Sequence, residues 1–171
     1  QPDLNRLDPV RDGLTVFFTI LVYTGYALLV VALMSLAEQR GAAITARRGL
    51  VWGLAGFAVI HLAPGFSLAP EVPGAAAAAV EPRQIWWFAT VFAAAGAAWL
   101  VAFSGRWIAW AAATVLVLAP HLIGAPEPET FAGTAPPELA ALFAARSFGV
   151  ALAGWLLLGG LAGHFWSREA A

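Results

Sequence analysis

The sequence predicts an all-α, polytopic membrane helix bundle that forms a single integral membrane domain over residues 1–171. Its composition is 61% apolar and 11% charged, with a mean hydropathy of +0.78. Soluble domains are roughly 45–50% apolar and about 25% charged, so this composition is that of a bilayer protein. The charged residues also separate five long apolar runs, and each run is a candidate transmembrane helix.

The first span is expected over residues 13–37, an uncharged run that Asp12 and Glu38 bound. It is long enough to cross a hydrocarbon core of ~30 Å, which takes about 20 helical residues. The second span, over 47–63, is shorter because it is expected to stop at Pro64. We expect it to gain length from flanking Arg side chains that reach the membrane surface and from turns that continue past the proline.

The third span is expected over residues 84–104, again long enough to cross the bilayer. The fourth, over 106–121, is as short as the second, because its apolar run meets Pro120. The fifth is expected over 138–166, and its interior carries a single charge, Arg146. Five spans place the two ends of this chain on opposite sides of the membrane.

Charge is distributed unevenly between the two ends of these spans. Eight of the ten acidic residues fall at one end, which we call the acidic face: Asp3, Asp8, Asp12, Glu71, Glu81, Glu127, Glu129 and Glu138. Arg residues lie close to the span ends on the other face: Arg40, Arg47, Arg48, Arg106 and Arg168. By the positive-inside rule, we expect the Arg-rich loops in the cytoplasm and the acidic loops in the periplasm.

The second and fourth spans end alike. One closes with Ile60-His61-Leu62-Ala63-Pro64 and the other with Ala119-Pro120-His121-Leu122, and each is followed by a loop rich in Pro and Glu. Spans one and two, like spans three and four, form a hairpin, so the pattern is that of a parallel internal repeat of two hairpins. Paired short, Pro-interrupted segments point to a transport site. We therefore expect the second and fourth spans to pack against each other.

The two histidines are candidate metal ligands. Neutral imidazole is the commonest metal ligand, and carboxylates complete an O/N site suited to divalent first-row ions. Glu71, Glu127 and Glu129, in the loops that follow, are the candidate carboxylates. Two other interpretations stay open: His61 and His121 cap helix C-termini, where positive charge suits the helix dipole, or they ligate a haem or pigment.

Other classes of function are disfavoured by what the sequence lacks. It has no cysteine, which excludes disulfides and thiolate metal sites within it. Net charge is −1 and no basic cluster occurs, so we expect no nucleic-acid binding. We find no nucleophile–His–acid arrangement, phosphate-binding loop or HExxH motif, and we therefore expect no enzymatic activity.

Several stretches resemble a known family. Arg48-Gly49-Leu50-Val51-Trp52-Gly53-Leu54-Ala55-Gly56-Phe57 leads into His61-Leu62-Ala63-Pro64 and Pro70-Glu71-Val72-Pro73-Gly74. Further along come Arg83-Gln84-Ile85-Trp86-Trp87 and Ala119-Pro120-His121-Leu122-Ile123-Gly124-Ala125-Pro126. In order and spacing these stretches, which cover the second to fourth spans, resemble CbtA, the proposed cobalt transporter subunit family.

The resemblance implies a multi-pass protein of the bacterial or archaeal inner membrane that works with a small membrane partner, CbtB. It also implies one more N-terminal membrane helix, six in all, and a His-rich loop that precedes the first of the five spans. Six spans would place both termini in the cytoplasm and the His-rich loop on the acidic face.

Together these observations predict a subunit of an inner-membrane uptake system for divalent cations, with Co²⁺ as the transported ion and no other cofactor. His61 and His121 would be ligands, and Glu71, Glu127 and Glu129 would attract or coordinate the ion. The alternatives are a structural or accessory subunit of a larger membrane complex, or a haem- or pigment-binding membrane subunit. The bilayer is an expected partner, and homo- and hetero-oligomers both fit the sequence.

Overall fold

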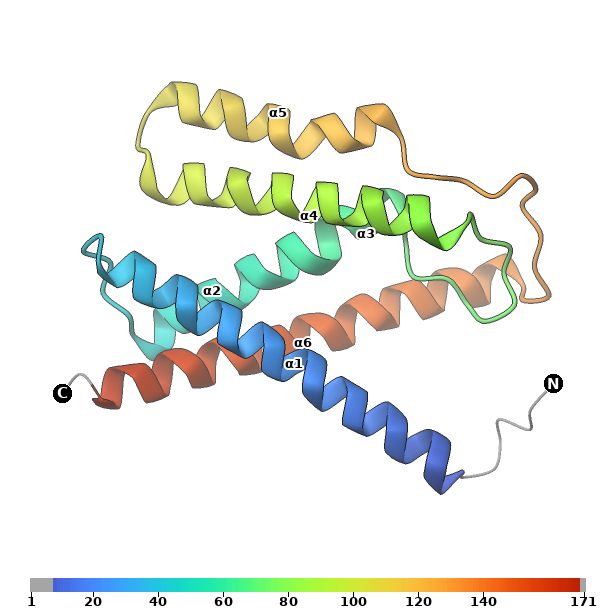
Figure 1. Ribbon diagram of the computed structural model, residues 1–171, viewed down its shortest axis with the longest axis horizontal. Helices are drawn as coiled ribbons and strands as arrows, with labels where there is room; N and C mark the ends of the chain where they lie inside the picture. The colour runs from blue at the N-terminus through green and yellow to red at the C-terminus, as the bar shows by residue number, and fades with distance from the viewer. Residues whose placement is uncertain (1–7, 170–171) are drawn as a thin grey trace.

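The computed structural model describes residues 8–169, all of whose regular structure is helical, which confirms the predicted fold class. The elements are α1 (Pro9–Glu38), α2 (Ala46–Phe57), the π-helix η1 (Ala58–Leu62), α3 (Ala63–Ser67), α4 (Val80–Phe103), α5 (Trp107–Ile123) and α6 (Pro137–Glu169) (Figure 1). By length and composition, α1, the segment 46–67, α4 and α6 can each cross a membrane, and α5 is a shorter apolar helix. Asp3 of the predicted acidic face lies outside the described residues.

The second span extends beyond its predicted boundary at residue 63, through the turns that were expected to continue past Pro64. The segments α2, η1 and α3 follow one another without a break and reach Ser67. In the π turn, the Ala63 N–H donates to the carbonyl of Ala58, five residues back. Proline lacks an N–H and its ring clashes with the carbonyl four residues before it in a regular α-helix, and the wider π turn relieves that clash.

The fourth span also passes its proline. α5 continues through Pro120 to Ile123, and Gly124 ends it with a φ of +94°, a conformation that glycine adopts without strain. The Pro120 carbonyl accepts hydrogen bonds from the Gly124 N–H at 3.1 Å and from the Trp86 indole N–H of α4 at 3.2 Å. The Trp86 bond therefore joins α4 to the last turn of α5.

α2 packs along α6 through glycines. Gly49 and Gly53 of α2 and Gly159 and Gly163 of α6 are all buried where the two backbones meet. A Cβ added at Gly49 would collide with the carbonyl oxygen of Gly159, and one added at Gly53 with that of Trp155. Such close approach is the usual basis of helix association in membranes.

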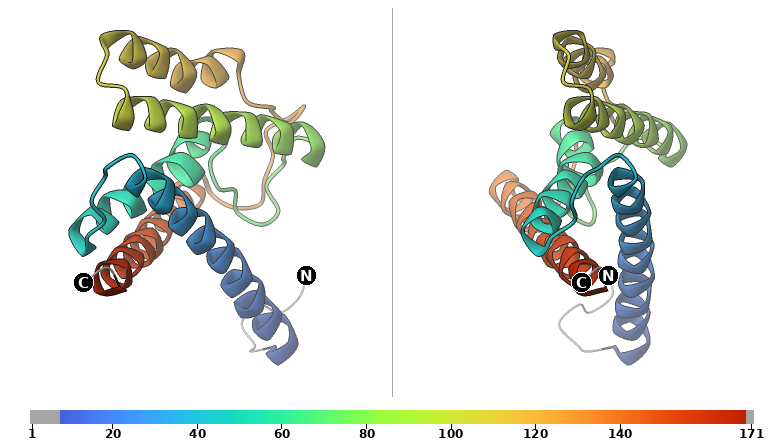
Figure 2. Two further views of the ribbon diagram at one scale, coloured as in Figure 1. Left: turned by 60° about the vertical axis from the view of Figure 1, so that its left-hand side comes forward. Right: turned by 90° about the vertical axis from the view of Figure 1, so that its left-hand side faces the viewer.

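The expectation that the second and fourth spans pack against each other is therefore wrong. α2 makes its most extensive interface with α6, whereas a groove separates the 46–67 segment from α5. The two predicted hairpins also differ, because α4 and α5 pack along each other while α1 touches α2 only slightly. The buried residues of α1, Val30, Met34 and Ala37, fall in its second half, and its first half extends away from the other helices (Figure 2).

The two Pro/Glu-rich loops lie at the same end of the bundle, as predicted. Loops 68–79 and 124–136 meet there, and the Ala76 N–H donates to the carbonyl of Ala132 at 2.7 Å. The α1–α2 and α4–α5 connections and the end of α6 lie at the opposite end (Figure 1). The acidic loops and the Arg-rich connections thus occupy opposite ends of the bundle.

Candidate functional site

His61 lies in the π turn, inside a cluster of aromatic rings. Its half-buried ring stacks on Phe57 at a centroid distance of 6.2 Å and meets Tyr26 of α1 at 6.4 Å and Trp155 of α6 at 6.2 Å, both edge-on. The His61 Nε2 atom is buried and has no hydrogen-bond partner within residues 8–169. The cluster therefore fixes the plane of the imidazole and leaves this nitrogen unoccupied by the protein.

His121 lies in the last turn of α5, in a more polar setting. Its Nδ1 atom lies 2.8 Å from the hydroxyl oxygen of Ser67, the last residue of α3. Its ring also meets Phe66 edge-on at 5.3 Å and Trp86 at 5.8 Å. The Ser67 contact engages Nδ1, so Nε2 is the ring nitrogen left to bind another group.

His121 also lines the groove between the 46–67 segment and the α4–α5 pair. This groove has a volume of about 660 Å³, and small residues such as Ala58, Ala97 and Ala113 form much of its wall. Among the described residues that line it, His121 is the one with an imidazole or a formal charge. Chemistry along this groove therefore centres on His121.

The structure does not bring the two histidines into one cluster. The rings around His61 come from α1, α2 and α6, whereas the side chains around His121 come from α3 and α4, and the two sets share no residue. Within residues 8–169, no group of three or more His, Asp or Glu side chains is placed to hold a metal ion. The matching sequence contexts thus become two separate imidazole positions.

The three candidate carboxylates occupy two settings. Glu71 Oε2 lies 3.1 Å from Arg83 Nη2, and the two side chains are 34% and 27% exposed. Glu127 and Glu129 are exposed in loop 124–136 and make no ion pair with another described residue. The charge of Glu71 is therefore partly neutralised, while Glu127 and Glu129 keep theirs.

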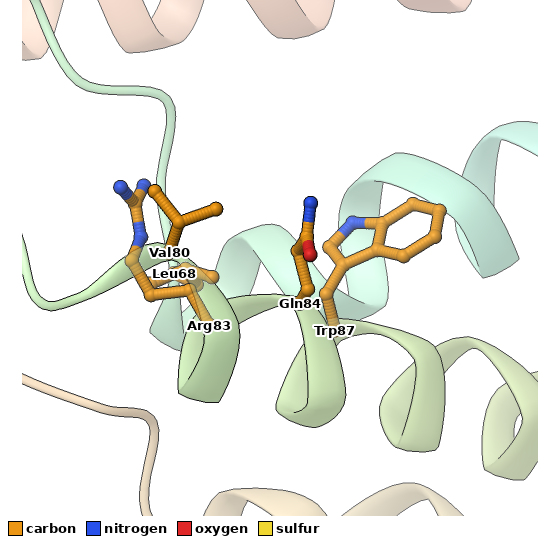
Figure 3. A pocket seen from close by; sticks show the side chains of 5 residues that line it. All are labelled: Leu68, Val80, Arg83, Gln84 and Trp87. Carbon is orange, nitrogen blue, oxygen red and sulfur yellow. The ribbon is translucent and has the colours of Figure 1, made fainter.

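A pocket of about 210 Å³ lies beside the Glu71–Arg83 ion pair, at the start of α4. Figure 3 shows the side chains of Arg83, Gln84 and Trp87 on the same side of this helix, with Leu68 and Val80 next to Arg83. The Arg83 Nε atom is buried and has no hydrogen-bond partner in the described part of the chain. In the sequence, Arg83, Gln84 and Trp87 were notable only as part of a stretch that resembles the family.

Sequence reasoning missed the neighbours that define each imidazole. Ser67, Tyr26 and Trp155 come from three different helical segments, so no local spacing connects them with the histidines. The π turn has no sequence signal beyond the Pro64 that it accommodates. These contacts depend on tertiary packing.

The family model described as probable cobalt transporter subunit (CbtA) matches residues 3–167, nearly the whole chain. No protein of curated function and no solved structure matches it.

Proposed function

Because the chain belongs to the CbtA family of probable cobalt transporter subunits, we propose that it takes part in uptake of Co²⁺ across the inner membrane. The family match over residues 3–167 is the observation that carries this proposal. The four long apolar helices agree with a multi-pass transport subunit. A subunit implies a further component, and we take it to be a small membrane protein of the CbtB type.

The hydrogen bonding of the two imidazole rings supports a role for both histidines as metal ligands. A metal-bound histidine usually engages its second ring nitrogen in a hydrogen bond, which fixes the tautomer and the ring orientation. His121 has this arrangement, with Nδ1 held by Ser67 and Nε2 available. His61 has a buried Nε2 atom that no described residue engages in a hydrogen bond. Imidazole nitrogen is a suitable ligand for divalent first-row ions such as Co²⁺.

We assign the two histidines to successive positions on a path. Ser67 contacts His121 beside the acidic loops, and His61 lies six residues before Ser67 on the same helical segment. At a rise of 1.5 Å per residue, His61 is about 9 Å farther from the acidic end. An ion that arrives from the acidic loops would therefore meet His121 first and His61 second.

Each position offers one imidazole, so water or the partner subunit would supply the remaining ligands. Such incomplete coordination suits transport, because an ion must bind strongly enough to enter and weakly enough to leave. Glu127 and Glu129, which are exposed at the same end, would raise the local concentration of a dication. Glu71 would contribute less, since Arg83 offsets its charge.

The test is accumulation of radiolabelled Co²⁺ by cells that carry or lack this gene, with the partner gene present in both. The proposal predicts faster accumulation in the cells that carry it. Equal accumulation by the two kinds of cell, with the protein detected in the membrane of those that carry the gene, would contradict it. Repeating the assay with Mg²⁺ and Ni²⁺ as competitors measures the preference for cobalt.

A further inference from the structure

We propose that the pocket at the start of α4 binds the phosphate group of a phospholipid headgroup. The pocket has a volume of about 210 Å³, and Leu68, Val80, Arg83, Gln84 and Trp87 line it (Figure 3). It lies apart from both histidines, so this proposal does not rest on cobalt transport.

Unused hydrogen-bond donors are the first argument. A guanidinium has five N–H donors, yet among the described residues Arg83 has a single polar partner, Glu71, and its Nε is buried without one. The side chains of Gln84, which is exposed, and Trp87, which is partly buried, line the same pocket and donate no hydrogen bond to another described group. A buried donor such as the Arg83 Nε–H normally has an acceptor, and phosphate oxygens are acceptors that arginine binds well.

The position of the pocket is the second argument. Leu68 directly follows the end of α3, and Val80 is the first residue of α4. The candidate span 46–67 therefore ends beside the pocket, and the candidate span α4 begins beside it. A site where one span ends and the next begins lies at the membrane surface. Tryptophan and arginine side chains at such a level meet lipid headgroups.

The shape of the pocket favours a lipid over a free anion. Leu68, Val80 and the Trp87 ring provide an apolar wall that the glycerol and upper chains of a lipid would cover, while Arg83 and Gln84 face its phosphate. Glu71 also neutralises part of the Arg83 charge, which disfavours a doubly charged free phosphate more than a singly charged phosphodiester.

The experiment is native mass spectrometry of the purified, detergent-solubilised full chain with dioleoylphosphatidylglycerol as the probe. The Arg83→Gln variant should bind this lipid about tenfold more weakly than the parent, the usual effect of losing a hydrogen bond to a charged group. Dioleoylglycerol, which has the same chains and no phosphate, should bind parent and variant equally weakly. Equal binding of phosphatidylglycerol by Arg83→Gln and the parent would overturn the proposal.

Two control variants separate phosphate binding from folding. Glu71→Gln breaks the same ion pair but keeps the guanidinium, so it should bind the lipid at least as tightly as the parent. Arg106→Gln removes an exposed arginine at the start of α5 and should bind as the parent does. If Glu71→Gln lost binding as Arg83→Gln does, the effect would belong to the ion pair and the proposal would fail.

Inorganic phosphate distinguishes the two sources of the ligand. Failure of millimolar phosphate to displace the lipid from the parent supports a headgroup as the ligand. Displacement in the parent that is absent in Arg83→Gln supports the same phosphate site with free phosphate as a second ligand. Displacement to the same extent from every variant, Arg83→Gln included, would count against Arg83 as the phosphate ligand.

Discussion

The hydroxyl of Ser67 lies 2.8 Å from Nδ1 of His121, and this contact joins the end of α3 to the last turn of α5. The two residues are 54 positions apart and belong to the two segments whose sequences end alike. The similarity of those segments thus corresponds to a contact between their ends, although the histidines themselves have different neighbours.

Ser67→Ala tests whether this contact prepares His121 to bind a metal. We expect cobalt uptake to need about tenfold more Co²⁺ for half-maximal rate, because loss of a group that orients a metal-binding histidine typically weakens binding by 10–100-fold. Ser104→Ala, at the end of α4 on the opposite end of the bundle, is the matched control and should leave uptake unchanged. Unchanged uptake in Ser67→Ala would show that the hydrogen bond has no part in transport.

Gly159→Ala tests the close approach of α2 and α6. The new Cβ would collide with the Gly49 carbonyl oxygen and the Gly53 backbone, so the two helices must move apart. Overpacking of this kind costs about 1–3 kcal/mol, and we expect a lower thermal unfolding temperature in detergent. Gly149→Ala, on the same helix with no atom within 4 Å of the added Cβ, should not lower it. Equal unfolding temperatures for both variants would contradict this interface.

Sequence patterns were sufficient to predict the apolar helices and which loops share an end. Composition and charge placed the first span at 13–37, and α1 runs from Pro9 to Glu38. Proline was a poor guide to helix ends, because a π turn accommodates Pro64 and α5 continues through Pro120. Hydropathy does not report these local adjustments.

Helix pairing was not predictable in the same way. The glycines of the second span were visible in the sequence, but small residues show only that a close partner is allowed, not which helix it is. Gly159 and Gly163 turn out to face α2, whereas Gly149, on the same helix, is exposed. Since α2 pairs with α6, the two histidines lie among different helices despite their matching contexts.

The acidic loops give a prediction about ionic strength. The double variant Glu127→Gln/Glu129→Gln should raise the half-saturating Co²⁺ concentration by about fourfold per charge at low salt, from Coulomb's law for a dication ~10 Å from a carboxylate in water. Glu71→Gln should have a smaller effect, because Arg83 already offsets that charge. Uptake kinetics at low and high salt check both expectations, and the differences should shrink above about 0.15 M salt. A salt-independent effect would indicate direct coordination and not attraction.

Orientation can be tested with single cysteines, since the sequence contains none. We expect Ala77→Cys, exposed in the acidic loop 68–79, to react with a membrane-impermeant thiol reagent in intact cells. Ala43→Cys, exposed in the Arg-rich α1–α2 connection, should react only after the membrane is opened. Position 43 is preferred to Gly41 in the same connection, because the φ of +84° at Gly41 disfavours a side chain. The reverse labelling pattern would show that the acidic loops lie in the cytoplasm, opposite to the predicted orientation.

The central claim is that His61 and His121 bind the transported ion. The most direct measurement is the initial rate of radiolabelled Co²⁺ uptake by the double variant His61→Ala/His121→Ala, normalised to membrane-inserted protein, beside each single variant. We predict that each single variant loses most of the rate and that the double variant falls to the level of cells without the gene. Uptake by the double variant at the parental rate would contradict the claim.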